Sequence, residues 1–100
     1  MSELSLDARV AAGEDVLARE VEGDTVLLSM AQAEYYGLNP TGTRIWQLLQ
    51  EPRQLREICR TLASEFDVEP AILERDVLSV VEDLVSHGLA RIVSDDRPQR

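Results

Sequence analysis

The sequence contains no lysine, and its ten arginines stand against nineteen aspartates and glutamates, which gives a net charge of −9. So acidic a surface repels a phosphate backbone and has few cations that could displace counterions. We therefore expect no nucleic-acid partner. A peptide that carries arginine or lysine would suit this surface better.

Cysteine and histidine are almost absent. The single Cys59 and the single His87 allow neither an intrachain disulfide nor a local zinc motif. Cys59 lies on the apolar stripe of a predicted helix, so we expect it to be a small buried hydrophobe. His87 precedes Gly88 at a helix end, where it is expected to cap the helix or face solvent. We predict no metal site.

Motifs for catalysis and cofactor binding are missing too. No GxGxxG or GxxxxGK[ST] pattern occurs, so nothing indicates a phosphate cradle. The adjacent carboxylates Glu82–Asp83 and Asp95–Asp96 are expected on a solvated surface, because neighbouring helical residues point in different directions. We predict no cofactor and no enzymatic activity.

Long apolar runs are lacking, and the segment 1–5 has neither the basic nor the apolar region of a signal peptide. We therefore expect a cytoplasmic protein with no membrane partner. The length of 100 residues and the 44% hydrophobic content predict one globular domain over residues 1–100, with an ordered core at about 8–93. Residues 1–8 show no clear pattern and are expected to form a loose lead-in.

What is present is a regular succession of apolar segments and turn signals. Strands are predicted at 16–21, 25–30 and 34–39, with a tight turn at Glu22–Asp24. Helices follow at about 41–50, 53–66 and 70–86, and a short last strand at 89–93. The predicted fold class is α+β: a small winged-helix-like domain with a three-stranded antiparallel sheet, three α-helices and a short terminal strand.

The segment Leu38–Thr41 joins the third strand directly to the first helix. Pro40 suits a helix start, and either Asn39 or Thr41 can cap the helix. This junction holds the strands at a fixed angle to the helices, which can leave one strand edge open to pair with a peptide.

Alternation places Tyr36 and Leu38 on one face of the third strand, toward the first helix, and Tyr35 and Gly37 on the other. Tyr35 is either a surface aromatic that pairs across the sheet or a contact for a bound chain. Gly37 weakens a strand unless a close backbone approach makes use of it. The apolar stripe of the third helix is wider than one buried face needs, so part of it is expected to line a groove beside the third strand.

Five segments occur in an order and spacing that together are characteristic: Val26–Leu28, Leu38–Thr41, the Leu55/Ile58/Leu62 stripe, Arg75–Val77 and His87–Leu89. With them, the chain resembles the PqqD-like family, the RiPP recognition elements that bind leader peptides of ribosomally made, modified peptides. The resemblance covers about residues 8–93. Two further segments, Tyr35–Asn39 and Ile45–Trp46, look more like stand-alone members from lasso-peptide clusters.

The resemblance implies a function and a site. A leader peptide would add as an antiparallel strand to the third strand, with its side chains in the groove beside the third helix. A separate enzyme such as a leader peptidase would receive it. The peptide-binding residues implied are Glu34, Tyr35, Tyr36, Gly37 and Leu38 on the strand, with Leu73, Asp76, Val77 and Val80 on the helix. The loop 50–53 departs from the acidic-glycine turn frequent in the family.

Two other readings remain. A winged-helix DNA-binding regulator would use the third helix for recognition, but five acidic residues there outnumber the single Arg75. A small regulatory or assembly domain that binds only protein would share the fold and the lack of catalysis.

Overall fold

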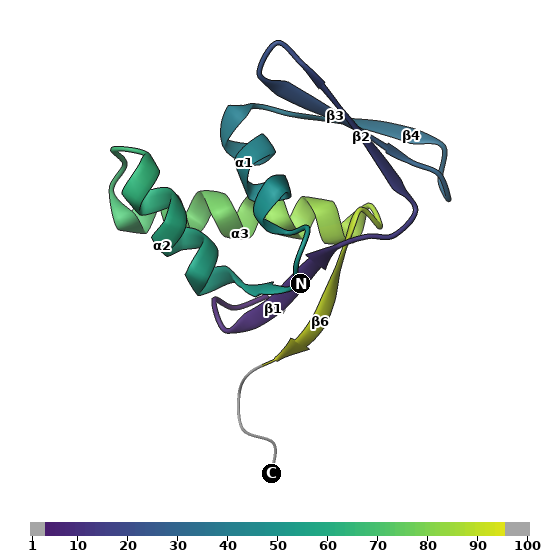
Figure 1. The fold of residues 1–100 in the computed structure, drawn as a ribbon. Helices are drawn as coiled ribbons and strands as arrows, with labels where there is room; N and C mark the ends of the chain where they lie inside the picture. The colour runs from purple at the N-terminus through teal and green to yellow at the C-terminus, as the bar shows by residue number, and fades with distance from the viewer. Residues whose placement is uncertain (1–3, 96–100) are drawn as a thin grey trace.

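The computed structural model describes residues 4–95, with side chains through residue 93. Over these described residues, six strands and three helices build the fold (Figure 1). Its class, α+β, is the one predicted from the sequence. In chain order, the elements are β1 (Ala8–Ala12), β2 (Val16–Val21), β3 (Asp24–Ser29), β4 (Glu34–Leu38), α1 (Pro40–Leu48), β5 (Arg53–Gln54), α2 (Leu55–Glu65), α3 (Pro70–Ser86) and β6 (Ala90–Asp95).

The predicted meander is an antiparallel sheet in the order β2-β3-β4. A two-residue loop joins β2 to β3, and both of its residues, Glu22 and Gly23, have positive φ (54° and 90°). Such a loop matches the twist of the flanking strands. β4 lies at one edge of this sheet and β2 at the other.

A second small sheet was not predicted. β1 lies between β5 and β6, so the short terminal strand has a partner more than 70 residues earlier in the chain. The sequence had suggested only a loose lead-in for residues 1–8, of which 1–3 lie outside the described residues. The missing strand, β1, supplies Val10, which has no exposed surface.

The helices agree with the prediction within about two residues at their ends. Asn39, rather than Thr41, caps α1, because its side-chain oxygen accepts a hydrogen bond from the Gly42 N–H at 2.8 Å. α2 starts later than expected, since residues 53–54 pair with β1. α3 ends at Ser86, and Gly88 follows with a φ of 74°.

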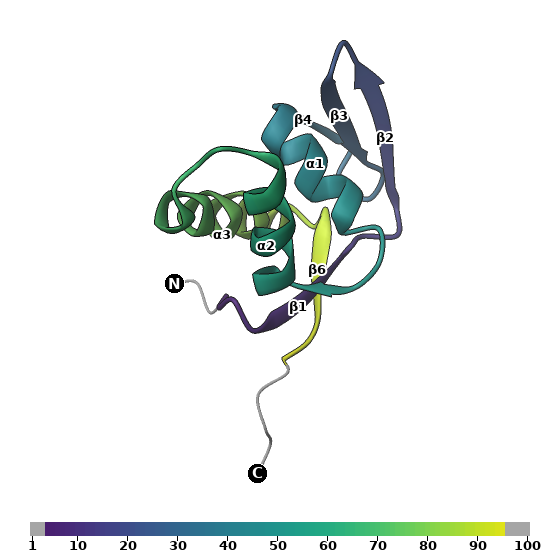
Figure 2. The ribbon, with the colours of Figure 1, turned by 60° about the vertical axis from the view of Figure 1, so that its left-hand side comes forward.

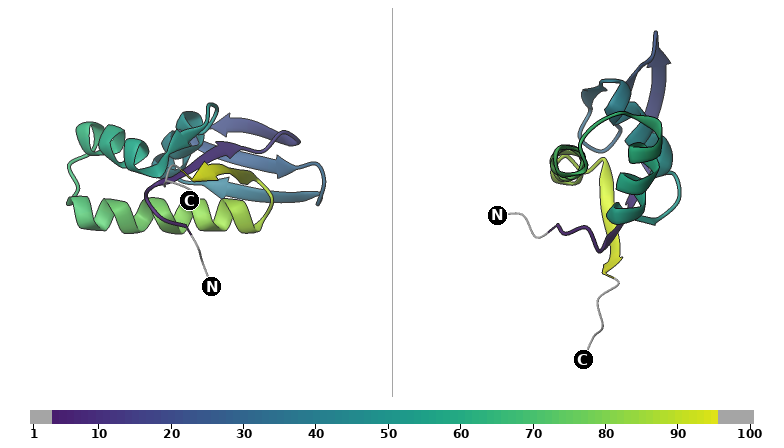
Figure 3. Two further views of the ribbon diagram at one scale, coloured as in Figure 1. Left: turned by 90° about the horizontal axis from the view of Figure 1, so that it is seen from below. Right: turned by 90° about the vertical axis from the view of Figure 1, so that its left-hand side faces the viewer.

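The core lies between the three helices and the two sheets (Figure 2). α1 packs against β3 and β4, whereas α2 packs against α3 and against β1 and β5 of the second sheet, and α3 also contacts β6. Its fully buried large side chains include Leu27, Ile45, Leu55, Leu62, Val77 and Leu84. In Figure 3, β4 runs alongside the C-terminal half of α3, and this placement creates the site described next. Within residues 4–95, no helix is both long and apolar enough to cross a bilayer.

Candidate functional site

Among the described residues, nothing pairs with the outer edge of β4. The ladder between β3 and β4 determines which residues face that edge. In the β2–β3 turn the Asp24 N–H is directed at Val21, and backbone groups of an antiparallel ladder alternate in direction. Counting along the register, Glu34, Tyr36 and Leu38 direct their backbone groups at β3. The N–H and C=O groups of Tyr35 and Gly37 therefore point toward the open edge.

α3 accompanies β4 in the opposite chain direction. Asp76 and Val80 lie near Asn39, just beyond the end of β4. The Tyr36 hydroxyl donates a hydrogen bond to the Asp83 carboxylate at 3.2 Å. The Tyr36 and His87 rings then lie 5.3 Å apart. The two elements thus form opposite walls over several residues.

Between these walls lies a groove of about 260 Å³. It is lined by Asn39 and Thr41 from the strand–helix junction and by Asp76, Ser79 and Val80 from α3. Asp76 is exposed and, within the described residues, has no hydrogen-bond or ion-pair partner. The groove therefore combines an apolar side chain, hydroxyl groups and a free carboxylate beside an open strand edge.

Tyr36 is half-buried, and burial raises the pKa of its phenol, with the Asp83 carboxylate raising it further by charge and by accepting its proton. The hydroxyl therefore stays protonated and acts as a donor. His87 is exposed and its Nδ1 lies 2.8 Å from the Asp83 carbonyl oxygen, so it stays at the helix end as expected.

The structure brings most of the sequence-derived site residues together. Glu34 and Gly37 are exposed, as is Tyr35 at 76%, while Leu38 is buried under the strand. Asp76 and Val80 line the groove. Val77 (0% exposed) and Leu73 (3% exposed) belong to the core instead. These two can support the groove wall from behind, but neither lines the groove.

Sequence reasoning missed Ser79 and Asp83. Both share a helix face with Asp76 and Val80, because residues three and four apart are neighbours on a helix. The spacing alone could have added them once Asp76 had been placed. Asn39 and Thr41 were considered only as capping residues, although they also line the groove.

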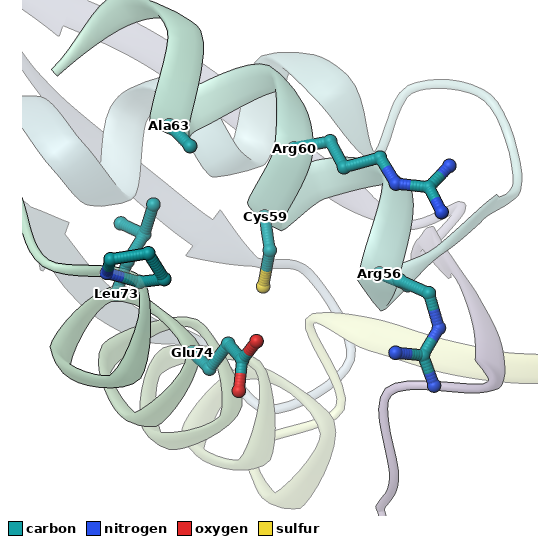
Figure 4. Close-up of a pocket in the computed structure, with 7 residues that line it drawn as sticks. Arg56, Cys59, Arg60, Ala63, Leu73 and Glu74 are labelled. Carbon is teal, nitrogen blue, oxygen red and sulfur yellow. The ribbon is translucent and has the colours of Figure 1, made fainter.

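A second cleft of about 230 Å³ lies between α2 and α3, on the side of Leu73 (Figure 4). Arg56 and Arg60 project from α2 and Glu74 from α3, with the Cys59 sulfur between the helices. Burial and the nearby Glu74 carboxylate raise the pKa of the Cys59 thiol. Cys59 is therefore a poor nucleophile, in keeping with its predicted role as a buried hydrophobe.

The fold and this site define a small α+β domain that holds an open strand edge against a helix. The family model described as coenzyme PQQ synthesis protein D (PqqD) matches residues 24–90. The chain belongs to the PqqD family, which confirms the resemblance seen in the sequence.

Two solved structures have closely similar folds. One, TbiB1 in complex with the TbiA(β) leader peptide, is 28% identical, with a TM-score of 0.76, and the match covers 85% of this chain and 99% of that one. The other, lasso peptide synthetase B1 complexed with the leader peptide, is 28% identical with a TM-score of 0.72, covering 82% and 96%. No curated protein matches the sequence.

Proposed function

We propose that this chain is a non-catalytic RiPP recognition element that binds the leader segment of a precursor peptide, most simply a lasso-peptide precursor. The leader adds as a strand to the open edge of β4. Its side chains on the inner face enter the groove beside α3. The bound leader is then delivered to a separate processing enzyme such as a leader peptidase.

The proposal rests on one observation: the backbone N–H and C=O groups of Tyr35 and Gly37 point toward the open edge of β4, beside the groove. An unpaired edge offers main-chain hydrogen bonds, and an adjoining groove reads alternate side chains, which is how strand addition combines affinity with specificity. The similarity to two proteins solved with leader peptides supports the same reading.

The charge of the groove favours a basic ligand. Asp76 has no partner among the described residues. Two more carboxylates lie on the walls of the site: Glu34 at the start of β4, and Asp83 on α3, which accepts the hydrogen bond from Tyr36. A partly desolvated charged hydrogen bond from the leader to Asp76 would contribute about 1.5–3 kcal/mol. The same carboxylates disfavour the alternative of a DNA-binding regulator, because Asp76, Glu82 and Asp83 are all exposed on α3.

A non-catalytic role accords with the side chains at the site. The groove-lining residues of α3 offer a carboxylate, a hydroxyl and an aliphatic group, without a nucleophile–base pair. Cys59 lies on the other side of α3, in the second cleft, and the pKa of its thiol is raised. Peptide chemistry would therefore be supplied by another protein, to which the leader is presented.

Strand addition can be tested with proline substitutions at the two edge-facing positions. The ligand is a synthetic leader peptide taken from a short open reading frame sought next to this gene, and binding is measured by titration calorimetry. Tyr35→Pro and Gly37→Pro each remove one outward N–H and block approach of a strand, so we expect at least a tenfold loss of affinity.

A matched control lies on the other edge of the same sheet. By the same alternation, the Glu20 N–H points away from β3, at the free edge of β2. Glu20→Pro also removes an outward N–H, two strands away from the proposed site, and should leave leader binding intact. If both β4 variants fold and bind the leader as tightly as the wild type does, strand addition to β4 is wrong.

A further inference from the structure

Gly37 lies within the edge strand β4, although the fold does not require glycine there. Its φ is outside the left-handed region, and a Cβ added to it meets no atom within 4 Å. Glycine weakens a strand, because it has more conformational freedom to lose and no side chain to pack. The space over Gly37 is thus open and unused by the described residues.

Gly37 adjoins a hollow on the outer face of the sheet, because its partner Val26 is one of the residues that line this hollow. The register places Gly37 opposite Val26, which in turn lies opposite Arg19. The adjoining hollow has a volume of about 480 Å³, and its lining residues are mostly apolar. Leu17, Val21 and Tyr35 in this lining are 58%, 50% and 76% exposed. Its lining residues are Leu17, Ala18, Arg19, Val21, Val26, Leu28 and Tyr35.

We propose that the residue of the bound peptide opposite Gly37 carries a large apolar side chain, which lies across Gly37 onto Val26 and the aliphatic stem of Arg19. This inference rests on the proposed function, because it needs a strand on β4. It adds a specificity position on the outer face, separate from the groove beside α3.

Strand geometry supports this placement. Because the backbone groups of Gly37 face the edge, the peptide residue opposite forms a hydrogen-bonded pair with it, with Cα atoms about 5.5 Å apart. Residues directly opposite share a face, so that side chain is on the outer face. Val26 is two strand spacings from the peptide, about 10 Å, and only a large side chain can meet it over the bare Gly37.

A peptide suits this hollow better than a second copy of the chain does. A stable interface uses about 20–30 residues on each side, far more than the lining of the hollow provides. Two copies would each carry a net charge of −9 and repel one another. Gly37 also lies on β4, the edge strand that a peptide strand would adjoin, so an added peptide would lie directly beside it.

The test uses a displayed library of random 12-residue peptides selected on the wild-type chain, with synthetic versions of the selected peptides measured by calorimetry. We expect them to share one large apolar residue, whose replacement by Ala weakens wild-type binding tenfold or more. Gly37→Ala, Gly37→Val and Gly37→Ile should lose affinity in order of size. The same Ala replacement in the peptide should weaken its binding to the Gly37→Val variant by less than threefold.

The melting temperature separates this effect from misfolding. Because the space is open, Gly37→Val should melt at or above the wild-type temperature. Unchanged peptide affinity in Gly37→Val would overturn the inference and leave leader binding in place. A selection that yields no peptide weakened by Tyr35→Pro would count against the proposed function itself. Dimerisation of the wild-type chain that Leu17→Asp abolishes would assign the hollow to a second copy and also overturn the inference.

Discussion

Asp76 is the one groove residue whose charge has no partner in the described part of the chain. Its immediate neighbour in the sequence, Val77, is fully buried, whereas Asp76 is exposed and lines the groove. Successive helical residues differ by about 100° in direction, so one position separates a core residue from a ligand-facing one. The Asp76 carboxylate can therefore contact a ligand, and the folded chain does not have to bury its charge.

The charge of Asp76 can be removed with little change in shape. Asp76→Asn should weaken binding of the cognate leader about tenfold or more, which corresponds to about 1.4 kcal/mol. The melting temperature should change little. Exposed charge pairs contribute only about 0–1 kcal/mol to stability, and Asp76 is an exposed charge near Arg75. Calorimetry at low salt gives the affinity. An unchanged dissociation constant would return Asp76 to the surface.

Thr25 presents the opposite situation, a buried polar group without a use. It is 1% exposed, and its hydroxyl oxygen has no hydrogen-bond partner among the described residues. Leaving such a group unpaired costs about 1–3 kcal/mol, and a methyl group of the same shape avoids that cost. Thr25→Val should therefore stabilise the fold by about 1 kcal/mol in urea unfolding.

Thr43 provides a comparison within α1. Within the part of the chain that the structure describes, its hydroxyl oxygen is also unpaired, and the residue is 7% exposed. The gain from Thr43→Val should be smaller than that from Thr25→Val, because valine suits a strand better than a helix. A destabilised Thr25→Val variant would show that the hydroxyl does find a partner in solution.

At the scale of elements, local signals predicted most boundaries. Pro40 and Asn39 mark the start of α1, Gly88 follows the end of α3, and Gly23 allows the first hairpin. Each works through its own backbone or cap, so the neighbouring sequence is enough to read it. The third helix was predicted at 70–86, as observed.

Elements formed by distant partners were less predictable. β1 consists of Ala8–Ala12, and alanine has little preference for strands, so the segment extends only because β6 and β5 pair with it. The two-residue β5 shortened the predicted second helix for the same reason. On α3, the wide apolar stripe could not reveal which residues face β4, and two of the residues assigned to the site, Val77 and Leu73, are buried in the structure.

Val10 tests how much the unpredicted strand contributes. It is fully buried, in β1 between β5 and β6. Val10→Ala should lower the free energy of unfolding by about 2 kcal/mol, since it removes buried methyl groups and leaves a cavity. Val21→Ala, at a 50% exposed position, should stay within about 0.5 kcal/mol. Equal effects of the two substitutions in urea unfolding would mean that β1 adds little to the core.

At the scale of the whole molecule, the acidic surface and the open edge act together. An exposed edge strand invites pairing with other copies, and charge is one way in which proteins prevent it. With a net charge of −9, two copies repel each other, while a basic peptide is attracted. The same charge thus favours the proposed ligand and disfavours self-association.

The isolated chain should neither cleave nor modify the leader. A catalytic residue needs partners that activate it, and the Cys59 thiol has a raised pKa and lies away from the groove. Mass spectrometry of the precursor after long incubation with the pure protein checks this expectation. Leader removal that Cys59→Ala abolishes would contradict it.

Salt should separate the two parts of leader binding. Main-chain hydrogen bonds to β4 and apolar contacts depend little on ionic strength, whereas the attraction to Asp76 and the surrounding carboxylates is screened beyond a Debye length of about 10 Å at 0.1 M salt. We expect the affinity of a basic leader to fall between about 0.05 and 0.5 M NaCl, but binding to persist. With Asp76→Asn, the affinity should fall less steeply with salt than it does with the wild type. A wild-type affinity that does not respond to salt would mean that the groove binds its ligand without using its charge.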